Sequence, residues 1–150
     1  MKIGDRAPDF ELPDETGTLR RLSEMLAAGP VVLYFYPAAM TYGCTKESCH
    51  FRDLASEFER IGAQRVGISA DPVDKQRQFS EKHGFDFPLL SDPDRKVAEA
   101  YGVKRAIGLL KVKRTTFVID RDGTIKDVIS SETNMNAHAD RALAALRNNG

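Results

Sequence analysis

The chain has 150 residues, 41% of them hydrophobic and 29% charged, a composition typical of a globular protein with its own core. The 22 Lys and Arg residues balance the 22 Asp and Glu residues, which argues against nucleic acid or an anionic membrane as the main partner. No apolar run approaches a membrane span and the charged start lacks a signal core, so we expect one cytoplasmic domain over residues 1–150.

The first half of the chain predicts a hairpin, a short helix, a buried strand and a long helix. Residues 10–22 form two short strands around the turn at 14–17, and Ser23 caps a helix that ends at Ala28. Residues 31–36 (VVLYFY) are continuously β-branched or aromatic, which predicts a strand buried on both faces. Apolar residues then recur at helical spacing over 43–60.

The second half continues with alternating strands and helices. The predicted elements are a strand at 65–70, helices at 73–83 and 94–101, hairpin strands at 115–120 and 124–130, and a closing helix at 137–146. Gly84 and Gly102 stand where glycine ends a helix. The order predicts an α/β protein of thioredoxin-like fold. We expect a central mixed sheet flanked by helices, an N-terminal β-hairpin, and a parallel pair at the first crossover.

Two cysteines are too few for a secreted disulfide scaffold. Cys44 falls just past the end of a predicted buried strand, in the first turn of the long helix. Free backbone N–H groups and the helix dipole favour an anion there, and a thiolate is the reactive form of cysteine. The alternative is that Cys44 packs as a small buried hydrophobic residue. Its place at a strand-to-helix junction weakens this alternative but leaves both interpretations open until the neighbouring residues are considered.

The residues before Cys44 favour the reactive interpretation. Pro37 ends the strand and its ring can shield the sulfur from water, while the hydroxyl of Thr41 can lie beside the sulfur and donate to it. The segment from Pro37 to Cys44 (PAAMTYGC) matches the P-x-x-x-T-x-x-C signature of peroxiredoxins. A second cysteine, Cys49, followed by FRD at 51–53, resembles the bacterioferritin-comigratory protein or PrxQ branch of that family.

The resemblance extends over nearly the whole chain, through GDRAPDFELPDETG at the start, YFYP before the signature and RTTFVIDRDG late in the sequence. It implies a thiol peroxidase that reduces hydrogen peroxide and organic hydroperoxides through a sulfenic acid on Cys44. Cys49 would resolve that acid as an intramolecular disulfide, and thioredoxin or a similar dithiol reductant would recycle it. The resemblance also implies a monomer with no cofactor besides its thiols.

The family match also assigns Arg114, which precedes the late core strand. Attack on an O–O bond builds negative charge on the departing oxygen, and a fixed guanidinium stabilises such charge. The alternative is a solvated basic loop residue, as expected for Lys111 and Lys113. Glu47, one turn past Cys44, either orients this arginine or is a carboxylate on the helix surface.

Two features depart from the branch. Tyr42 replaces a proline and is a candidate for the pocket entrance, and Ala38, Ala39 and Met40 replace a more polar loop. The three residues that define the signature are all present. Peroxidase chemistry is therefore still expected, while substrate preference is open.

The spacing of the cysteines has a geometric consequence. Five residues on a helix give a rise of about 7.5 Å and rotate the side chains by about 140°, so the two Cα atoms are roughly 8–9 Å apart. A disulfide tolerates no more than about 7 Å. A bond between Cys44 and Cys49 therefore requires the start of the helix to unwind. The alternative is that Cys49 packs the helix and never reacts.

A metal site fits poorly, since C-x₄-C is not a common zinc spacing and only His50 is close to the pair. We expect surface or capping roles for His50, His83 and His138. A thioredoxin-like disulfide oxidoreductase is the competing enzyme, but position 47 is Glu where C-x-x-C requires Cys, and no proline precedes Phe117. A redox-signalling or chaperone protein is a third possibility, with the apolar loop 106–110 as its docking surface.

Overall fold

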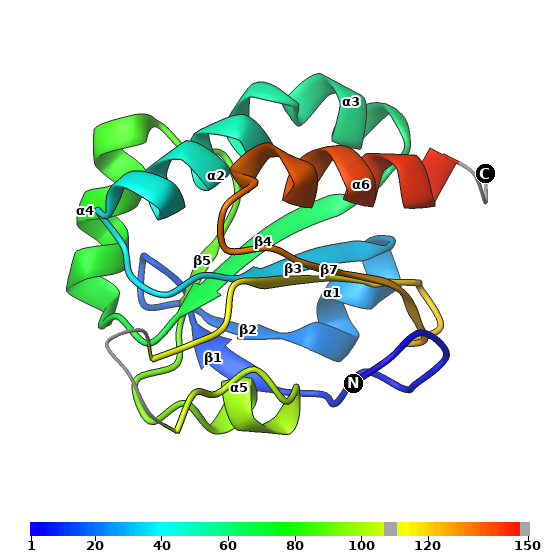
Figure 1. The fold of residues 1–150 in the computed structure, drawn as a ribbon, viewed down its shortest axis with the longest axis horizontal. Helices are drawn as coiled ribbons and strands as arrows, with labels where there is room; N and C mark the ends of the chain where they lie inside the picture. Colours follow the sequence, from blue (N-terminus) through cyan, green and yellow to red (C-terminus); the bar gives the residue numbers. More distant parts are fainter. Residues whose placement is uncertain (107–110, 148–150) are drawn as a thin grey trace.

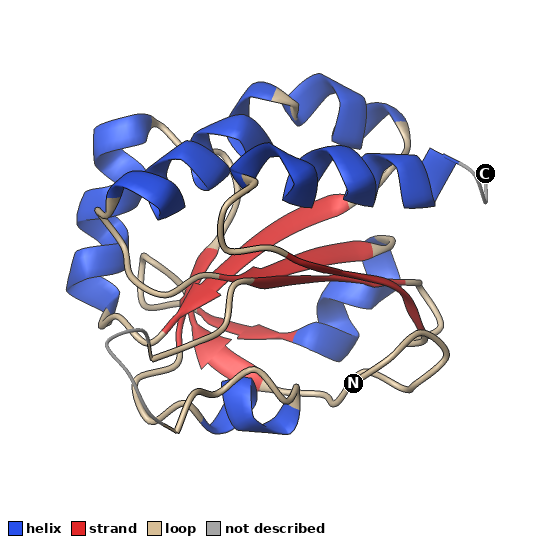
Figure 2. Ribbon diagram, viewed as in Figure 1, coloured by secondary structure: helices blue, strands red, loops and turns tan. Residues whose placement is uncertain are grey.

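In a computed structural model, which describes residues 1–106 and 111–147, a five-stranded mixed sheet forms the centre of the molecule (Figures 1 and 2). The strands lie in the order β5-β4-β3-β6-β7. Their bounds are Val31–Phe35 (β3), Gln64–Ser69 (β4), Leu89–Ser91 (β5), Thr115–Ile119 (β6) and Ile125–Ser130 (β7). β3, β4 and β5 run parallel, while β6 is antiparallel to β3 and β7 to β6. The predicted parallel crossover is confirmed.

Helices cover both faces of the sheet. The helices on one face are α2 (Tyr42–Asp53), α3 (Ala55–Arg60), α4 (Val73–His83) and α6 (Met135–Arg147) (Figure 1). The other face is covered by α1 (Leu22–Ala28), α5 (Lys96–Ala100) and an antiparallel hairpin of β1 (Glu11–Pro13) and β2 (Leu19–Arg21). This is the thioredoxin-like arrangement, with its N-terminal hairpin, that the sequence predicts.

The apolar run at 31–36 is buried on both faces because alternate side chains point to opposite helix layers. Val31, Leu33 and Phe35 belong to the core beneath α1 and α5. The side chains between them, at positions 32, 34 and 36, belong to the core beneath α2, α4 and α6. Each face of β3 thus supplies the centre of one core.

The structure corrects three boundaries. The helix predicted over 43–60 is broken at Leu54, whose φ of −95° and ψ of 18° interrupt the helical ladder between α2 and α3. Ser23 lies inside α1 and does not cap it; instead, its backbone N–H donates to Oδ1 of Asp9 at 2.9 Å. The helix predicted over 94–101 is shorter, at 96–100.

Strand β5 was not predicted, because three residues are too few to establish an alternating pattern. By contrast, α4 has the predicted bounds and ends at Gly84, which adopts φ of 63° as a left-handed cap. Residues 107–110 of the proposed docking loop lie outside the described residues. No helix in the described ranges is long and apolar enough to cross a membrane.

Candidate active site

The sheet register brings the two ends of the predicted site together. Phe35, the last residue of β3, pairs with Thr115, the first residue of β6. Arg114 therefore stands beside the end of the strand that leads to Cys44. Alternate residues of an extended chain point to the same side, so the side chains of Arg114, just before β6, and Thr116, within it, point to one face of the sheet. That face lies beneath α2 and α6.

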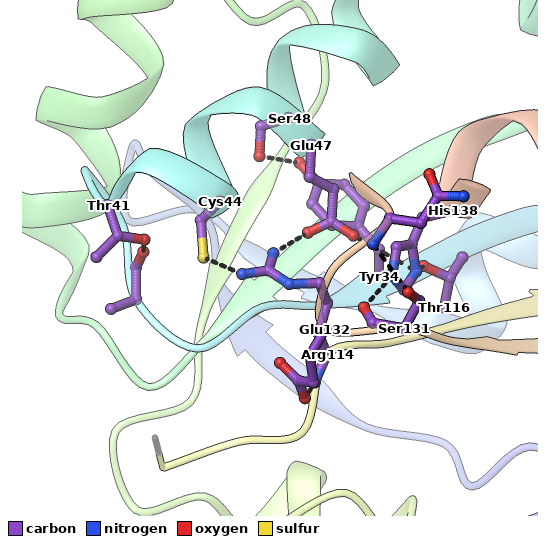
Figure 3. Close-up of polar contacts among 12 residues, drawn as sticks. Tyr34, Thr41, Cys44, Glu47, Ser48, Arg114, Thr116, Ser131, Glu132 and His138 are labelled. Atoms are coloured by element: carbon purple, nitrogen blue, oxygen red, sulfur yellow. Dashed lines mark hydrogen bonds and ion pairs between the residues drawn. The ribbon is translucent and has the colours of Figure 1, made fainter. Parts of the chain in front are cut away.

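The guanidinium of Arg114 contacts the Cys44 sulfur directly. Nη2 donates to Sγ at 3.2 Å, across 70 residues of sequence, and both side chains are buried (Figure 3). Cys44 also lies in the first turn of α2, whose N-cap is Thr41. A fixed cation and a helix N-terminus thus converge on one buried sulfur.

Glu47 orients Arg114 and is not a carboxylate on the helix surface, so the first of the two alternatives for this residue is correct. Its side chain is fully buried, and its Oε1 accepts a hydrogen bond from Nη1 of Arg114 at 2.6 Å (Figure 3). The two ends of the guanidinium fork are therefore divided between Cys44 and Glu47. Burial raises the pKa of Glu47 to about 8, although the charge of Arg114 acts in the opposite direction.

His138 was assigned a surface or capping role, and this prediction is wrong. Its side chain is fully buried, with Nδ1 at 2.7 Å from the hydroxyl of Thr116 and Nε2 at 2.9 Å from the carbonyl oxygen of Ser131. Nδ1 also faces Glu47 Oε2 at 3.5 Å (Figure 3). The sequence did hold a signal, because position 138 is four residues before the buried Ala142 and so shares a helix face with it.

Thr41 lies near the sulfur in sequence, but its hydroxyl makes a different contact. It donates to the carbonyl oxygen of Ala38 at 2.7 Å, and the residue is exposed (Figure 3). Met40 before it adopts φ of 69°, a left-handed conformation that closes this tight turn. Rotation about the Thr41 side chain would turn the hydroxyl away from Ala38.

Pro37 is buried. It lines a cavity of about 310 Å³ together with Ala38 and residues of the loop between β4 and α4. In that loop, Asp71 accepts hydrogen bonds from the backbone N–H of Ala39 at 2.6 Å and from the Ser69 hydroxyl at 2.7 Å. The segment that leads into Cys44 is thus tied to the neighbouring strand.

Cys49 lies in the same helix as Cys44, and both thiols are free. Its side chain is half-buried, and burial raises the pKa of the Cys49 thiol. Because α2 is continuous from 42 to 53, the helical geometry keeps the two cysteines too far apart for a disulfide.

Tyr42 begins α2 and is 85% exposed, so its ring stands on the surface. His50 bonds Asp140 on α6 at 2.8 Å, which is a surface role. Among residues 1–106 and 111–147, no three His, Cys, Asp or Glu side chains are grouped as metal ligands.

Comparison with known proteins places this chain among peroxidases. Residues 3–128 match the model of the AhpC/TSA family. The crystal structure of peroxidoxin BcpB from Mycobacterium tuberculosis superposes with a TM-score of 0.95 and 65% identity, over 99% of this chain and 97% of that one. Chloroplastic peroxiredoxin Q of Sedum lineare is 38% identical over 96% of this chain and 77% of its own length.

A third similar protein is the bacterioferritin-comigratory protein of Xanthomonas campestris, whose structures concern its alkyl peroxide reduction. It has a TM-score of 0.85 and 34% identity, over 93% of this chain and 91% of that one. The fold and these relatives define a thiol peroxidase, an oxidoreductase that acts on peroxides with a thiol reductant. The chain belongs to the AhpC/TSA family, within the peroxiredoxins of the bacterioferritin-comigratory protein and PrxQ type.

Proposed function

We propose that Cys44 is the nucleophile of this peroxidase and that Arg114, Thr41 and Pro37 form its pocket. The observation that carries the proposal is the 3.2 Å contact between Arg114 Nη2 and Cys44 Sγ. A guanidinium in this place stabilises the thiolate before attack. It also lies within reach of the oxygen that acquires negative charge during attack.

The reaction proceeds by displacement at oxygen. The Cys44 thiolate attacks one oxygen of hydrogen peroxide or an organic hydroperoxide, so an S–O bond forms as the O–O bond breaks. The sulfur becomes a sulfenic acid, and the departing oxygen takes up a proton from solvent and leaves as water or an alcohol. Pro37 limits the access of water to the sulfur. The Thr41 hydroxyl, once turned from Ala38, donates to a peroxide oxygen.

Cys49 resolves the sulfenic acid. Its thiol attacks the oxidised sulfur of Cys44, water departs, and a disulfide joins the two residues. Its half-buried, protonated thiol suits this role, because it competes poorly with Cys44 for peroxide while α2 is folded. The first turns of α2 unwind for this step.

Two electrons from outside the chain must then reduce the disulfide. Thioredoxin or a similar dithiol protein is the proposed donor, which places the enzyme in the reducing cytoplasm. We also propose that it acts as a monomer. The large apolar side chains exposed on the described surface are Met1, Ile3, Leu19, Met40 and Tyr42. Single exposed apolar residues do not require a partner surface.

The test is peroxide consumption with a thioredoxin recycling system. Cys44→Ser should abolish turnover and leave the fold intact, because Ser is nearly isosteric but far less nucleophilic. More than trace activity in this variant would rule out Cys44 as the nucleophile. Sedimentation of the reduced and of the oxidised protein tests whether each form is a monomer.

A further inference from the structure

One carboxyl oxygen of Glu47 is buried without a hydrogen-bond donor among the described residues. Oε1 accepts from Arg114, but Oε2 has no hydrogen-bond partner there. The polar atom that faces Oε2 is Nδ1 of His138, at 3.5 Å (Figure 3). A bare carboxylate oxygen in such a place is unfavourable, because it has lost its water without gaining a donor. The protonation state of this pair therefore needs an explanation.

The other contacts of His138 decide which ring nitrogen carries hydrogen. Nε2 lies 2.9 Å from the carbonyl oxygen of Ser131, which only accepts, so Nε2 is a donor. In a neutral ring Nδ1 is then an acceptor with one lone pair, which the Thr116 hydroxyl at 2.7 Å shares with any proton on Glu47 Oε2 at 3.5 Å. An ionised Glu47 would then place two acceptors, Oε2 and Nδ1, against each other. A single proton between them removes this conflict.

We propose that Glu47 and His138 hold one shared proton between Oε2 and Nδ1, and that this proton leaves the charge of Arg114 to the Cys44 thiolate. The proton rests either on the carboxyl group or on the imidazole. The net charge of the pair is zero in both cases. Without the proton, the pair would be negative, and Arg114 would face both the Glu47 carboxylate at 2.6 Å and the Cys44 thiolate at 3.2 Å. It would then stabilise each anion less.

The charges around the pair are consistent with this assignment. Burial raises the pKa of Glu47 to about 8 and lowers the pKa of His138, so the acid and the neutral ring are both favoured near pH 7. The other charged groups that act on the pair are Arg114 before β6, Glu132 before α6, and Arg141 on α6.

Glu132 does not supply the proton that Oε2 lacks. Its Oε1 accepts from the side chain of Arg105 at 2.9 Å and from the backbone N–H of Arg114 at 3.0 Å. These two donors lower the pKa of Glu132 against the opposing effect of burial, so this carboxylate stays ionised. Glu132 fixes the backbone of Arg114, whereas Glu47 and His138 set how its charge is divided. In this sense His138 is a positioning residue that acts through Glu47.

The shared proton can be observed without measuring activity. Infrared spectra near pH 7 should show a protonated carboxyl group that disappears in Glu47→Gln and persists in Glu59→Gln, since Glu59 is exposed on α3. Nitrogen NMR of the wild-type protein should show His138 neutral with hydrogen on Nε2. If the proton rests on the ring, an imidazolium signal replaces the carboxyl signal. If neither the carboxyl signal nor the imidazolium signal is observed, the proposal is overturned. The NMR measurement requires no variant.

The consequence for the sulfur is tested in a Cys49→Ser background, where Cys44 is the one remaining thiol of the two. Alkylation by iodoacetamide, followed against pH, reports the thiolate of Cys44. Glutamine resembles the protonated acid, because its amide donates to Nδ1 and its oxygen accepts from Arg114. Glu47→Gln should therefore leave the alkylation midpoint unchanged. A midpoint lowered by about one unit or more would show that the Glu47–His138 pair carries a net negative charge in the wild type, and would overturn the proposal.

The consequence for catalysis rests on the proposed role of Cys44, whereas the proton itself does not. If the spectra show the proton but Cys44→Ser remains an active peroxidase, the proposed function fails and the shared proton stands. If Cys44→Ser is inactive but neither spectrum shows the proton, the proposed function stands and the shared proton fails. The two conclusions are therefore tested separately.

Discussion

Arg65, buried on β4, donates from Nη1 to the carbonyl oxygen of Phe51 at 3.0 Å. This bond ties the C-terminal part of α2 to the sheet, and the ring of Phe51 stacks on Tyr34 with centroids 4.4 Å apart. The first turn of α2 is held differently, through the contact between Cys44 and Arg114 that oxidation of the sulfur would change. Unwinding of α2 should therefore begin at its N-terminus and stop before Phe51.

Oxidation with one equivalent of peroxide should form a Cys44–Cys49 disulfide and melt the start of α2. We expect faster amide hydrogen exchange from Gly43 to about Phe51, with protection retained beyond it. Mass spectrometry of the oxidised protein identifies the bond. A disulfide from Cys44 to a second chain, or to a small thiol, would contradict the intrahelical pairing.

Arg114→Ala should slow the reaction of Cys44 with peroxide by about 10²–10³, the usual effect of removing one donor from a developing negative charge. Lys113→Ala is the matched control, because Lys113 is exposed and adjacent in sequence. Rapid-mixing measurement of the first oxidation separates this step from recycling. An Arg114→Ala rate equal to that of the wild type would exclude the proposed role.

Cys49→Ser should still consume one equivalent of peroxide, since the first attack needs only Cys44. Without its resolving thiol, the sulfenic acid should persist, and excess peroxide should convert it to the irreversible sulfinic acid. Mass spectrometry detects the added oxygen atoms. Small thiols must be absent, because they would reduce the sulfenic acid in place of Cys49. Sustained turnover with thioredoxin at the wild-type rate would show that Cys49 is dispensable.

Asp71→Ala should weaken the peroxidase without unfolding the protein. The buried N–H of Ala39 loses its acceptor, which destabilises the segment carrying Pro37 and Thr41 by about 1–3 kcal/mol. Peroxide attack should slow more than in Asp74→Ala, a change at an exposed carboxylate of the following helix. Equal rates in the two variants would show that this bond does not position the pocket.

The Glu47–His138 pair predicts a characteristic pH dependence of stability. In the unfolded chain these groups titrate near pKa 4.5 and 6.5, whereas in the folded chain burial raises the pKa of Glu47 to about 8 and lowers the pKa of His138. Between pH 4.5 and 6.5 the pair binds one proton in both the folded and the unfolded chain, so its contribution to the free energy of unfolding does not change with pH. Below this range the unfolded pair binds a second proton, and stability falls as the pH drops.

Above pH 6.5 the unfolded pair binds no proton while the folded pair keeps one, so stability falls as the pH rises towards 8. The loss should amount to about 2 kcal/mol at a slope near 1.4 kcal/mol per pH unit. Urea unfolding near pH 6.5 and near pH 8 measures this loss of stability. Glu47→Gln should remove this decline and Glu59→Gln should keep it; a decline that survives in Glu47→Gln would assign it to other groups.

Periodicity predicted most elements because β3, α4 and the β6–β7 hairpin have apolar patterns long enough to show a period. It could not indicate the break at Leu54, where the pattern continues while the helix axis changes. The meeting of Cys44 and Arg114 was predicted only through the family resemblance. Its physical cause, the pairing of Phe35 with Thr115, is a long-range register that local patterns do not contain. The role of His138 was missed for the same reason, since it depends on the packing of α6 against β6.

The antiparallel addition of β6 to β3 has a consequence for biosynthesis. A ribosome makes Cys44 long before Arg114, because 70 residues separate them. A nascent chain that has not reached β6 carries the thiol and the start of α2 but lacks the guanidinium that would hold a thiolate there. This long-range pairing closes late in folding. On the proposed roles of Cys44 and Arg114, the enzyme becomes reactive towards peroxide only when its sheet is complete, and the unfinished chain is protected from premature oxidation.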